Sequence, residues 1–289
     1  MKFVINSLTC LFRKIVRSEI MISTENVAQS GIFFSCIEKN KLVTEQLVPE
    51  HLLMHVYKGK ITITTADKTF VILPGQTALF SKNQLAKFTK ESDGDSGFKA
   101  VTMFFTKPFL QQFYEGISEH QKKSDFKVLF IEPHALLNNL FESVSLYSNM
   151  EDAMITEELS LLKVKEALTM SRTLNKNVDS LLSDFSEPYK IDLSDFMQKN
   201  FMFNISIPRF AYLTGRSLAT FKRDFHKTFG VSPQKWLTKK RLLQAHFLIA
   251  EKKQKPSQVY EEVGFENFSH FTYSFRRFFG YTPSSLLSS

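Results

Sequence analysis

PSQVYEEVGFENFSHFTYSFRRFFGYTP at residues 256–283 and NISIPRFAYLTGRSLATFKRDFHKTFG at residues 204–230 decide the fold of the C-terminal part of this chain. Each stretch contains a short segment with helical apolar spacing, then a glycine, then a second such segment. This is the pattern of a helix-turn-helix unit. A single longer helical stretch joins the two units. Two such units in one chain could place two helices in successive major-groove segments of one DNA site.

The first unit has helix signals at the expected positions. Ser206 is an N-cap candidate, and Pro208 lies in the first turn, where proline is favoured. Gly215 supplies the permissive backbone of the turn, and Ser217 is the N-cap candidate of the second helix. We expect three apolar residues of that second helix to face the core: Leu218, Phe221 and Phe225.

The second unit repeats this arrangement. Pro256 opens a helix that ends at Gly264, and the turn at residues 265–267 leads into a second helix over residues 268–279. We expect the core face of that helix to consist of three phenylalanines: Phe271, Phe275 and Phe278. The polar residues on the opposite faces of both second helices remain for solvent or a partner.

The positive charge of the chain is concentrated in the same region. The whole sequence has a net charge of +8, but residues 204–289 hold 14 Lys and Arg against 5 Asp and Glu, which gives +9. The rest of the chain carries 23 Lys and Arg and 24 Asp and Glu. This asymmetry indicates a polyanionic partner for the C-terminal part alone.

Composition narrows the class of protein. With 289 residues, of which 43% are hydrophobic and 23% charged, the chain can form one large domain or two ordinary ones. Its 2 cysteines indicate no disulfide framework and no metal cluster, so we expect a reducing, cytoplasmic setting. No apolar run approaches the ~20 residues that span a bilayer, and we expect no membrane partner. We find no Gly-rich phosphate loop and no catalytic arrangement, and we expect neither enzyme activity nor a cofactor.

The N-terminal part changes character along its length. Residues 31–106 contain short β-branched and aromatic runs between turn residues, which predicts a small barrel or sandwich. Within residues 108–185, three stretches instead show helical spacing: 108–118, 133–150 and 157–174. The last has an apolar stripe that must be buried in its own domain or against a second protomer: Leu159, Leu162, Val164, Ala167 and Leu168. Pro188 and its polar neighbours mark a linker. Residues 1–20 are basic but lack a signal-peptide cleavage site, and either Met1 or Met21 could be the start.

Residues 190–286 resemble the DNA-binding domain of AraC/XylS-type transcription regulators. The resemblance is carried by FGVSPQKWLTKKRLLQAHFLIA, by VGFENFSHFTYSFRRFFGYTPSSL and by the distance between them. It implies two helix-turn-helix units bridged by the helix around residues 236–250, with recognition helices about one helical turn of DNA apart. The chain departs from the family pattern at residues 259–262, where VYEE replaces the usual Ile-Ala pair. The bulky Tyr260 therefore bears on the packing of the second unit.

The resemblance assigns DNA contacts by motif position. The base-facing places fall on six residues: Ala219, Lys222, Arg223, Ser269, Thr272 and Tyr273. Contacts to the DNA backbone are expected from five others: Thr220, Lys227, His270, Arg276 and Arg277. Backbone contacts position a protein on DNA, whereas base-edge contacts give sequence specificity. Because the first unit offers Lys222 and Arg223 to the bases, we expect it to contribute more of the sequence discrimination.

The β-rich region resembles the cupin-like sensor domain that often precedes this DNA-binding domain. The carrier is HVYKGKITITTADKTFVILPGQTALFSKN at residues 55–83. The resemblance implies effector sensing, by residues still unknown, and dimerisation through the helices after the barrel. His51 and His55 would share one strand face, as metal-binding histidines of cupin enzymes do. Further ligands are not evident, so we expect no metal, with one histidine on the surface and one lining the barrel.

Together these observations predict an α+β chain of four parts. They are a flexible tail (1–22), a cupin-like sensor and dimerisation domain (23–182), a linker (183–190) and an all-α double helix-turn-helix domain (191–289). We expect a homodimer that binds promoter DNA, contacts RNA polymerase and activates transcription under control of a small-molecule or protein effector. Two alternatives remain: a cupin-type metal enzyme fused to a DNA-binding domain, and a nonspecific nucleic-acid-binding protein.

Overall fold

The computed structural model describes residues 31–37, 41–48, 50–94, 97–115, 117, 128–149, 157–183, 185 and 188–287. The tail predicted for residues 1–22, which includes Cys10, lies outside these ranges. The chain divides into two compact units between residues 185 and 186. No helix in the described ranges is long and apolar enough to cross a membrane.

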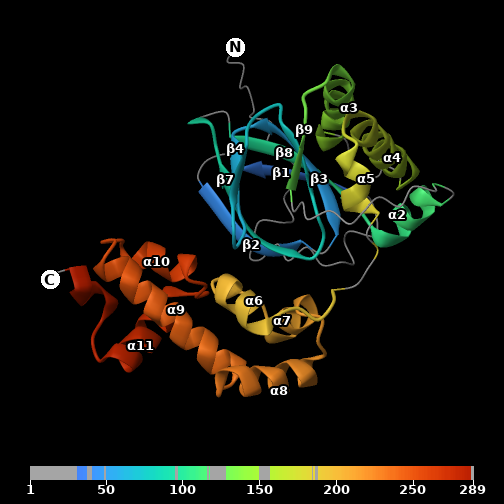
Figure 1. Ribbon diagram of the computed structural model, residues 1–289. Coiled ribbons are helices and arrows are strands. Elements are labelled where there is room, and N and C mark those ends of the chain that lie inside the picture. The colour runs from blue at the N-terminus through green and yellow to red at the C-terminus, as the bar shows by residue number, and fades with distance from the viewer. Residues whose placement is uncertain are drawn as a thin grey trace, which may run out of the picture. The chain divides into compact units, whose positions relative to one another are not determined.

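The first unit contains two antiparallel sheets (Figure 1). Their strands are β1 (Ile32–Ile37), β2 (Lys41–Val48), β3 (His51–Lys58), β4 (Lys60–Thr64), β5 (Thr69–Ile72), β6 (Thr77–Phe80), β7 (Gln84–Glu91), β8 (Phe98–Phe105) and β9 (Val128–Ile131). The five-stranded sheet has the order β1-β8-β3-β6-β9, and the four-stranded sheet has the order β2-β7-β4-β5. Among the described strands no pairing joins the two sheets, so they do not close into one continuous barrel.

The five-stranded sheet is covered on both faces. Every residue of β3 from His51 to Val56 is buried, and successive side chains of a strand point to opposite faces. Leu52 and Met54 belong to the core between the two sheets, whereas Leu53 belongs to the core between the sheet and the helices. Apolar residues therefore occur on both faces of β3, because each face lies in a core.

Helices pack on the outer face of the five-stranded sheet (Figure 1). They are α2 (Lys107–Tyr114), α3 (Ala135–Ser145), α4 (Glu157–Leu174) and α5 (Asn177–Leu182). Within the predicted stripe of α4, Val164, Ala167 and Leu168 are buried in this core. Leu162 of the same stripe is exposed within this unit.

One strand lies between two stretches for which the sequence predicts helices. β9 pairs antiparallel with β6 at the edge of the five-stranded sheet, with Ile131 opposite Thr77. Its sequence VLFI is too short to distinguish strand spacing from helical spacing. The sequence therefore makes no prediction for residues 128–131, which form an edge strand beside β6.

A polar network connects three of the helices. Tyr114 Oη donates to Asp179 Oδ1 at 2.6 Å, and Arg172 Nη2 donates to Asp179 Oδ2 at 2.8 Å. The Arg172 guanidinium also lies over the ring of Phe113, 5.3 Å from its centroid. This network fixes the ends of α2 and α5 against α4.

The second unit consists of helices (Figure 1). They are α6 (Leu193–Asn200), α7 (Ile207–Leu213), α8 (Leu218–Phe229), α9 (Pro233–Ala250), α10 (Pro256–Glu262) and α11 (Phe268–Phe279), followed by a 3-10 turn (Pro283–Leu287). α7 and α8 form one helix pair, α10 and α11 form another, and α9 packs against both. The predicted arrangement of an N-terminal sheet region and a helical C-terminal domain is confirmed.

α8 and α11 have the same length and the same internal pattern. Adding fifty to a residue number of α8 gives the matching residue of α11. Three phenylalanines and the left-handed glycine C-cap recur at matching positions: Phe221, Phe225, Phe229 and Gly230 in α8, and Phe271, Phe275, Phe279 and Gly280 in α11. Neighbouring rings are 5.5 and 4.4 Å apart in α8 and 5.7 and 4.6 Å apart in α11. The two helices therefore expose equivalent faces.

Two predicted core positions in these helices are wrong. Leu218 is 39% exposed and Phe278 is 45% exposed. Phe279 packs against the core instead of Phe278, because spacing by four continues the line of Phe271 and Phe275. Leu218 is the first residue of its helix, where side chains have fewer neighbours.

The segment 189–203, which contains α6, lies against the turns of both helix pairs. A Cβ atom on Gly215 would lie 2.3 Å from the carbonyl carbon of Tyr189, and a Cβ atom on Gly264 would lie 2.3 Å from the carbonyl oxygen of Met202. Both glycines also have positive φ, which favours glycine. α6 therefore connects two turns that pack too closely for any side chain.

Candidate nucleic-acid interface

Side-chain caps define where α8 and α11 begin. Ser217 Oγ accepts a hydrogen bond from the backbone N–H of Thr220 at 3.3 Å, and Asn267 Oδ1 accepts one from His270 at 2.8 Å. Such caps satisfy N–H groups that have no partner within the helix. Ser217 Oγ also donates to Thr220 Oγ1 at 3.0 Å. The side chain of Thr220, a predicted contact to the DNA backbone, therefore belongs to the cap. His270 is exposed.

The exposed face of α8 carries three of the predicted base-facing residues. Ala219, Lys222 and Arg223 are all exposed, as is the predicted backbone contact Lys227. The Arg223 side chain is 76% exposed, and its Nη2 atom lies 3.6 Å from Asp224 Oδ1. An exposed ion pair of this length contributes little to stability. The guanidinium can therefore leave it for a nucleic-acid partner.

The exposed face of α11 has a different chemistry. Ser269 and Tyr273 are exposed, as are the predicted backbone contacts Arg276 and Arg277. Thr272 is half-buried, and its hydroxyl oxygen is buried without a hydrogen-bond partner among the described residues. Of the three predicted base-facing residues in this helix, Thr272 is therefore the one whose hydroxyl does not face solvent.

One cation of the basic segment is used inside the first helix pair. Arg216 donates to the carbonyl oxygens of Ile191 and Thr214 at 3.0 and 2.7 Å. It also donates to Asp224 Oδ2 at 3.2 Å, and this hydrogen bond lowers the pKa of the Asp224 carboxyl. Arg216 thus joins the start of α6 to α8 and is not available to DNA.

A second cation is buried near the other helix pair. Arg241 in α9 donates to the carbonyl oxygens of Phe201 and Phe203, each at 2.8 Å. Both carbonyls follow α6 and belong to the neighbours of Met202, which packs against Gly264. A Cβ atom on Gly264 would also lie 3.0 Å from Arg241 Nε. Sequence reasoning missed this role, because the partners are backbone groups that residue type does not reveal.

The unusual Tyr260 is accommodated in the second helix pair. Its ring is half-buried against the core that Val259 and Phe271 share. It makes an edge contact with Phe268, with ring centroids 5.6 Å apart. Its hydroxyl donates to Glu261 Oε1 at 2.7 Å, and this hydrogen bond raises the pKa of the phenol. The bulky residue therefore adds a contact between α10 and α11.

His51 and His55 are both buried, at 2% and 5% exposure, so the expectation of one surface histidine is wrong. His55 Nδ1 lies 2.9 Å from Thr77 Oγ1, and its ring stacks on Phe141 with centroids 4.2 Å apart. Burial lowers the pKa of His55 to about 4. In the part of the chain that the structure describes, no group of three or more His, Cys, Asp or Glu could hold a metal ion.

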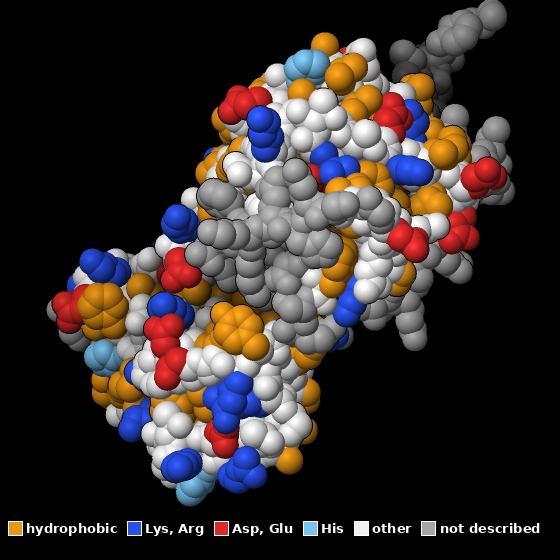
Figure 2. All heavy atoms as spheres, turned by 45° about the vertical axis from the view of Figure 1, so that its right-hand side comes forward, with side chains coloured by type: hydrophobic (Ala, Val, Ile, Leu, Met, Phe, Trp, Pro, Cys, Tyr) orange, Lys and Arg blue, Asp and Glu red, His pale blue; other side chains and the backbone are white. Residues whose placement is uncertain are grey.

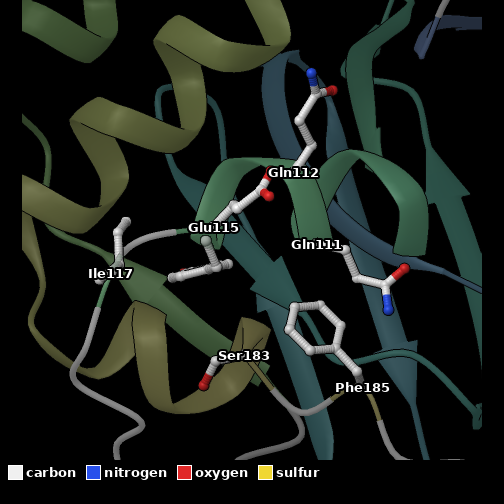
Figure 3. Close-up of a pocket in the computed structure, with 7 residues that line it drawn as sticks. Gln111, Gln112, Glu115, Ile117, Ser183 and Phe185 are labelled. Carbon is white, nitrogen blue, oxygen red and sulfur yellow. The ribbon is translucent and has the colours of Figure 1, made fainter.

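The first unit has a pocket beside α2 and α5 (Figure 3). It has a volume of about 500 Å³ and combines amide, carboxylate and aromatic groups: Gln111, Gln112, Tyr114, Glu115, Ile117, Ser183 and Phe185. The first four belong to α2 or its C-cap, and the last two follow α5. Its mixed lining favours no single class of ligand.

Charges of both signs are interspersed with apolar side chains on the face that Figure 2 shows. An extended surface with positive charges alone attracts polyanions without regard to their sequence. Residues 204–289 nevertheless carry a net charge of +9.

Two family models match the chain. One, described as a helix-turn-helix domain, matches residues 210–289. The other, described as an ExsA N-terminal regulatory domain, matches residues 51–183. The two matches fall on the helical C-terminal part and on the sheet-containing part, respectively.

Similar proteins of known name are transcription regulators. The HTH-type transcriptional regulator ExsA of Pseudomonas aeruginosa is 28% identical over 232 residues, which cover 78% of this chain and 82% of that protein. The virulence regulon transcriptional activator VirF of Yersinia enterocolitica is 39% identical over 92 residues, which cover 32% of this chain and 34% of that protein. The second match therefore spans about a third of its relative.

Solved structures also match. ToxT from Vibrio cholerae, solved at 1.65 Å, matches with 16% sequence identity and a TM-score of 0.40, over 90% of this chain and 98% of that chain. A probable AraC family transcriptional regulator from Rhodopseudomonas palustris matches with 28% identity and a TM-score of 0.30, over 33% of this chain and 91% of that chain.

Proposed function

The chain is a transcription regulator with an AraC-type helix-turn-helix DNA-binding domain and an N-terminal regulatory domain, and from this premise we propose how it recognises its promoter. α8 and α11 are the recognition helices of two helix-turn-helix units. They enter adjacent major-groove segments on one face of the DNA. The observation that supports this most directly is the repeat, because the buried phenylalanines and the glycine C-caps of both helices fall in the same register.

Base recognition is divided between the two helices in this proposal. On α8, Arg223 pairs with a guanine and Lys222 and Ala219 contact neighbouring bases. On α11, Ser269 and Tyr273 face the bases, and Thr272 has the smaller part. The remaining contacts go to phosphates and are supported by exposure of the side chains or by position beside the helix caps: Thr220, Lys227, His270, Arg276 and Arg277.

In this proposal the N-terminal unit receives the regulatory signal and forms the interface with a second protomer. Its two sheets form a cupin-like barrel that is open between them, and an effector or partner protein acts on this unit. The exposed Leu161 and Leu162 of α4, at 51% and 58% exposure, support a dimer interface on the helical layer. Dimerisation joins two weak DNA sites into one tight site. DNA-bound protein then contacts RNA polymerase and activates transcription.

The division of roles is tested by binding measurements over a library of DNA sites. Arg223→Ala should relax specificity at one base pair, because a bidentate Arg–guanine contact contributes about 1–3 kcal/mol of discrimination. Arg276→Ala should weaken binding to all sites alike, because a phosphate contact carries no sequence information. An equal, sequence-independent loss in both variants would contradict the assignment.

Sequence-specific recognition itself is tested by footprinting at a promoter in the presence of competitor DNA. The proposal predicts a protected region that survives competition. A nonspecific nucleic-acid-binding protein would instead lose its footprint at the same salt concentration. This outcome would remove the proposed function altogether.

A further inference from the structure

The repeat of α8 and α11 allows their exposed residues to be compared position by position. Residue 219 corresponds to 269, 222 to 272 and 223 to 273. Two exposed candidate base readers occupy one matching position: the Arg223 side chain is 76% exposed, and Tyr273 is 65% exposed. One fixed place on two equivalent helices thus carries a guanidinium in the first helix and a phenol ring in the second.

The neighbours of that place also differ between the helices. Beside Arg223 lies the exposed cation Lys222, whereas beside Tyr273 lies Thr272, whose hydroxyl oxygen is buried. Before Arg276, α11 has no Asp, Glu, Lys or Arg, and its one histidine, His270, is assigned to the DNA backbone. The proposed base-facing residues in the N-terminal two turns of α11, which meet base edges in a helix-turn-helix unit, therefore offer hydroxyl groups and a phenol ring and no cation.

Phe268, the first residue of α11, is a second exposed aromatic residue, but it lies about 140° from Tyr273 around the helix. It is 40% exposed although it is aromatic. Its ring is held by Tyr260, 5.6 Å away, and by Phe271, 6.1 Å away. Phe268 therefore belongs to the contact between α10 and α11, and Tyr273 is the aromatic base-facing candidate of α11.

Base edges in the major groove offer one apolar group, the C5-methyl of thymine. A guanidinium in this position would select guanine through two hydrogen bonds, but a phenol ring cannot make that contact. We infer that Tyr273 reads a thymine through its methyl group, so that α11 specifies sequence by methyl recognition while α8 uses charged hydrogen bonds. This inference rests on the proposed role of α11 as a recognition helix.

The test uses the full-length protein and its promoter site, with each thymine replaced in turn by deoxyuridine. Uracil keeps every hydrogen-bonding group of thymine and lacks the methyl group. Replacement at one position in the segment that α11 faces should weaken binding about fourfold, the factor expected for burial of one methyl group. Replacement of thymines outside the protected region is the matched control and should change nothing.

Variants of Tyr273 then identify the reader. Tyr273→Ala should bind the thymine and uracil sites equally well, whereas Tyr273→Phe should keep the fourfold difference, because the ring makes the contact. Tyr273→Arg should change the preferred base at that position to guanine, since it reproduces the side chain at the matching position of α8. A circular dichroism spectrum like that of the unsubstituted protein shows that each variant is folded.

The inference is overturned if no thymine replacement in the protected region weakens binding, or if Tyr273→Ala keeps the difference. Loss of the difference in Tyr273→Phe would also overturn it, because the hydroxyl would then be the reading group. Failure of the proposed function is a separate result. In that case the unsubstituted protein gives no protected region on any promoter.

Discussion

At the scale of single residues, positive charge in the C-terminal unit serves two purposes. Arg216 and Arg241 donate to backbone carbonyls and hold α6 against the two helix pairs. Arg223, Arg276 and Arg277 are exposed. Removing a buried cation leaves carbonyl groups without donors and costs stability, whereas removing an exposed one affects binding alone. Residue type does not distinguish structural arginines from exposed ones, but their hydrogen-bond partners in the structure do.

The buried His55 makes the stability of the first unit depend on pH. Burial lowers its pKa from 6.5 to about 4. Below pH 6.5 the unfolded chain takes up a proton that the folded chain refuses, so the free energy of unfolding falls as the pH falls towards 4. Between pH 7 and pH 5 we expect a loss of about 2 kcal/mol.

This loss is measured by hydrogen exchange of amides in β3 and β8, expressed as free energies of opening. Fluorescence is less suitable, because the single Trp236 lies in the second unit. His55→Gln should be less stable at pH 7 and should show a weaker pH dependence than the unsubstituted protein. The control His226→Gln, at an exposed position of α8, should leave the pH dependence of β3 unchanged. An identical slope in His55→Gln would contradict the prediction.

At the scale of elements, two kinds of glycine with positive φ end helices of the second unit. Gly264 lies against the carbonyl oxygen of Met202, whereas no heavy atom comes within 4 Å of a Cβ atom placed on Gly280. Both would suffer the same kind of backbone strain on substitution. The difference in stability between variants at the two positions therefore measures how closely the turn at Gly264 packs on the segment that follows α6.

Substitution by alanine should therefore affect the two glycines unequally. Gly280→Ala should reduce the free energy of unfolding by about 1 kcal/mol, which is the cost of the left-handed conformation. Gly264→Ala should cost about 1–3 kcal/mol more, because the new methyl group overlaps Met202. Urea unfolding followed by helical circular dichroism measures both values. Equal losses of unfolding free energy in the two variants would show that the turn at Gly264 rearranges to accept the methyl group without loss of stability.

α9 sets the spacing of the two proposed recognition helices. With 18 residues it is about 27 Å long. Five extra base pairs between the DNA segments contacted by α8 and α11 should reduce binding to that of one helix pair, because they rotate one segment to the opposite face. Ten extra base pairs restore the face but add about 34 Å, which a rigid α9 cannot span. Recovery of binding at ten base pairs would indicate a flexible connection instead.

Much of the element pattern follows from the sequence, and the exceptions have physical causes. Ser217, Gly215 and Gly264 mark their cap and turns through local rules that depend on few neighbours. Phe278 and Phe279 are adjacent and identical in type, so composition cannot tell which one enters the core. β9 is determined by the edge of β6, a partner distant in the chain.

The candidate site is predictable to a similar extent. Exposure of the predicted base-facing residues follows from helical periodicity, except at Thr272, where the hydroxyl turns inward. The equivalence of Arg223 and Tyr273 also follows from the sequence, because three phenylalanines and a glycine recur at the same spacing in both units. Which bases these residues contact is still a prediction, and the two experiments on Arg223 and Tyr273 test it.

At the scale of the whole molecule, charge and assembly are linked. The excess positive charge lies in residues 204–289, whereas the remaining residues nearly balance. Each phosphate that a protein neutralises adds about 0.9 to the slope of log affinity against log salt concentration. A single substitution of a phosphate-binding cation therefore counts how many copies of that cation touch the DNA.

Arg277→Ala uses this relation to test for a dimer on DNA. If two protomers occupy one promoter site, the substitution should lower the magnitude of the salt slope by about 1.8, and if one protomer occupies it, by about 0.9. The proposed homodimer predicts the larger change. Lys58→Ala, which removes an exposed cation of β3 in the first unit, is the matched control and should leave the slope unchanged. Equal changes in both variants would show that the salt dependence reflects net charge and not phosphate contacts, because net charge changes by the same amount in each.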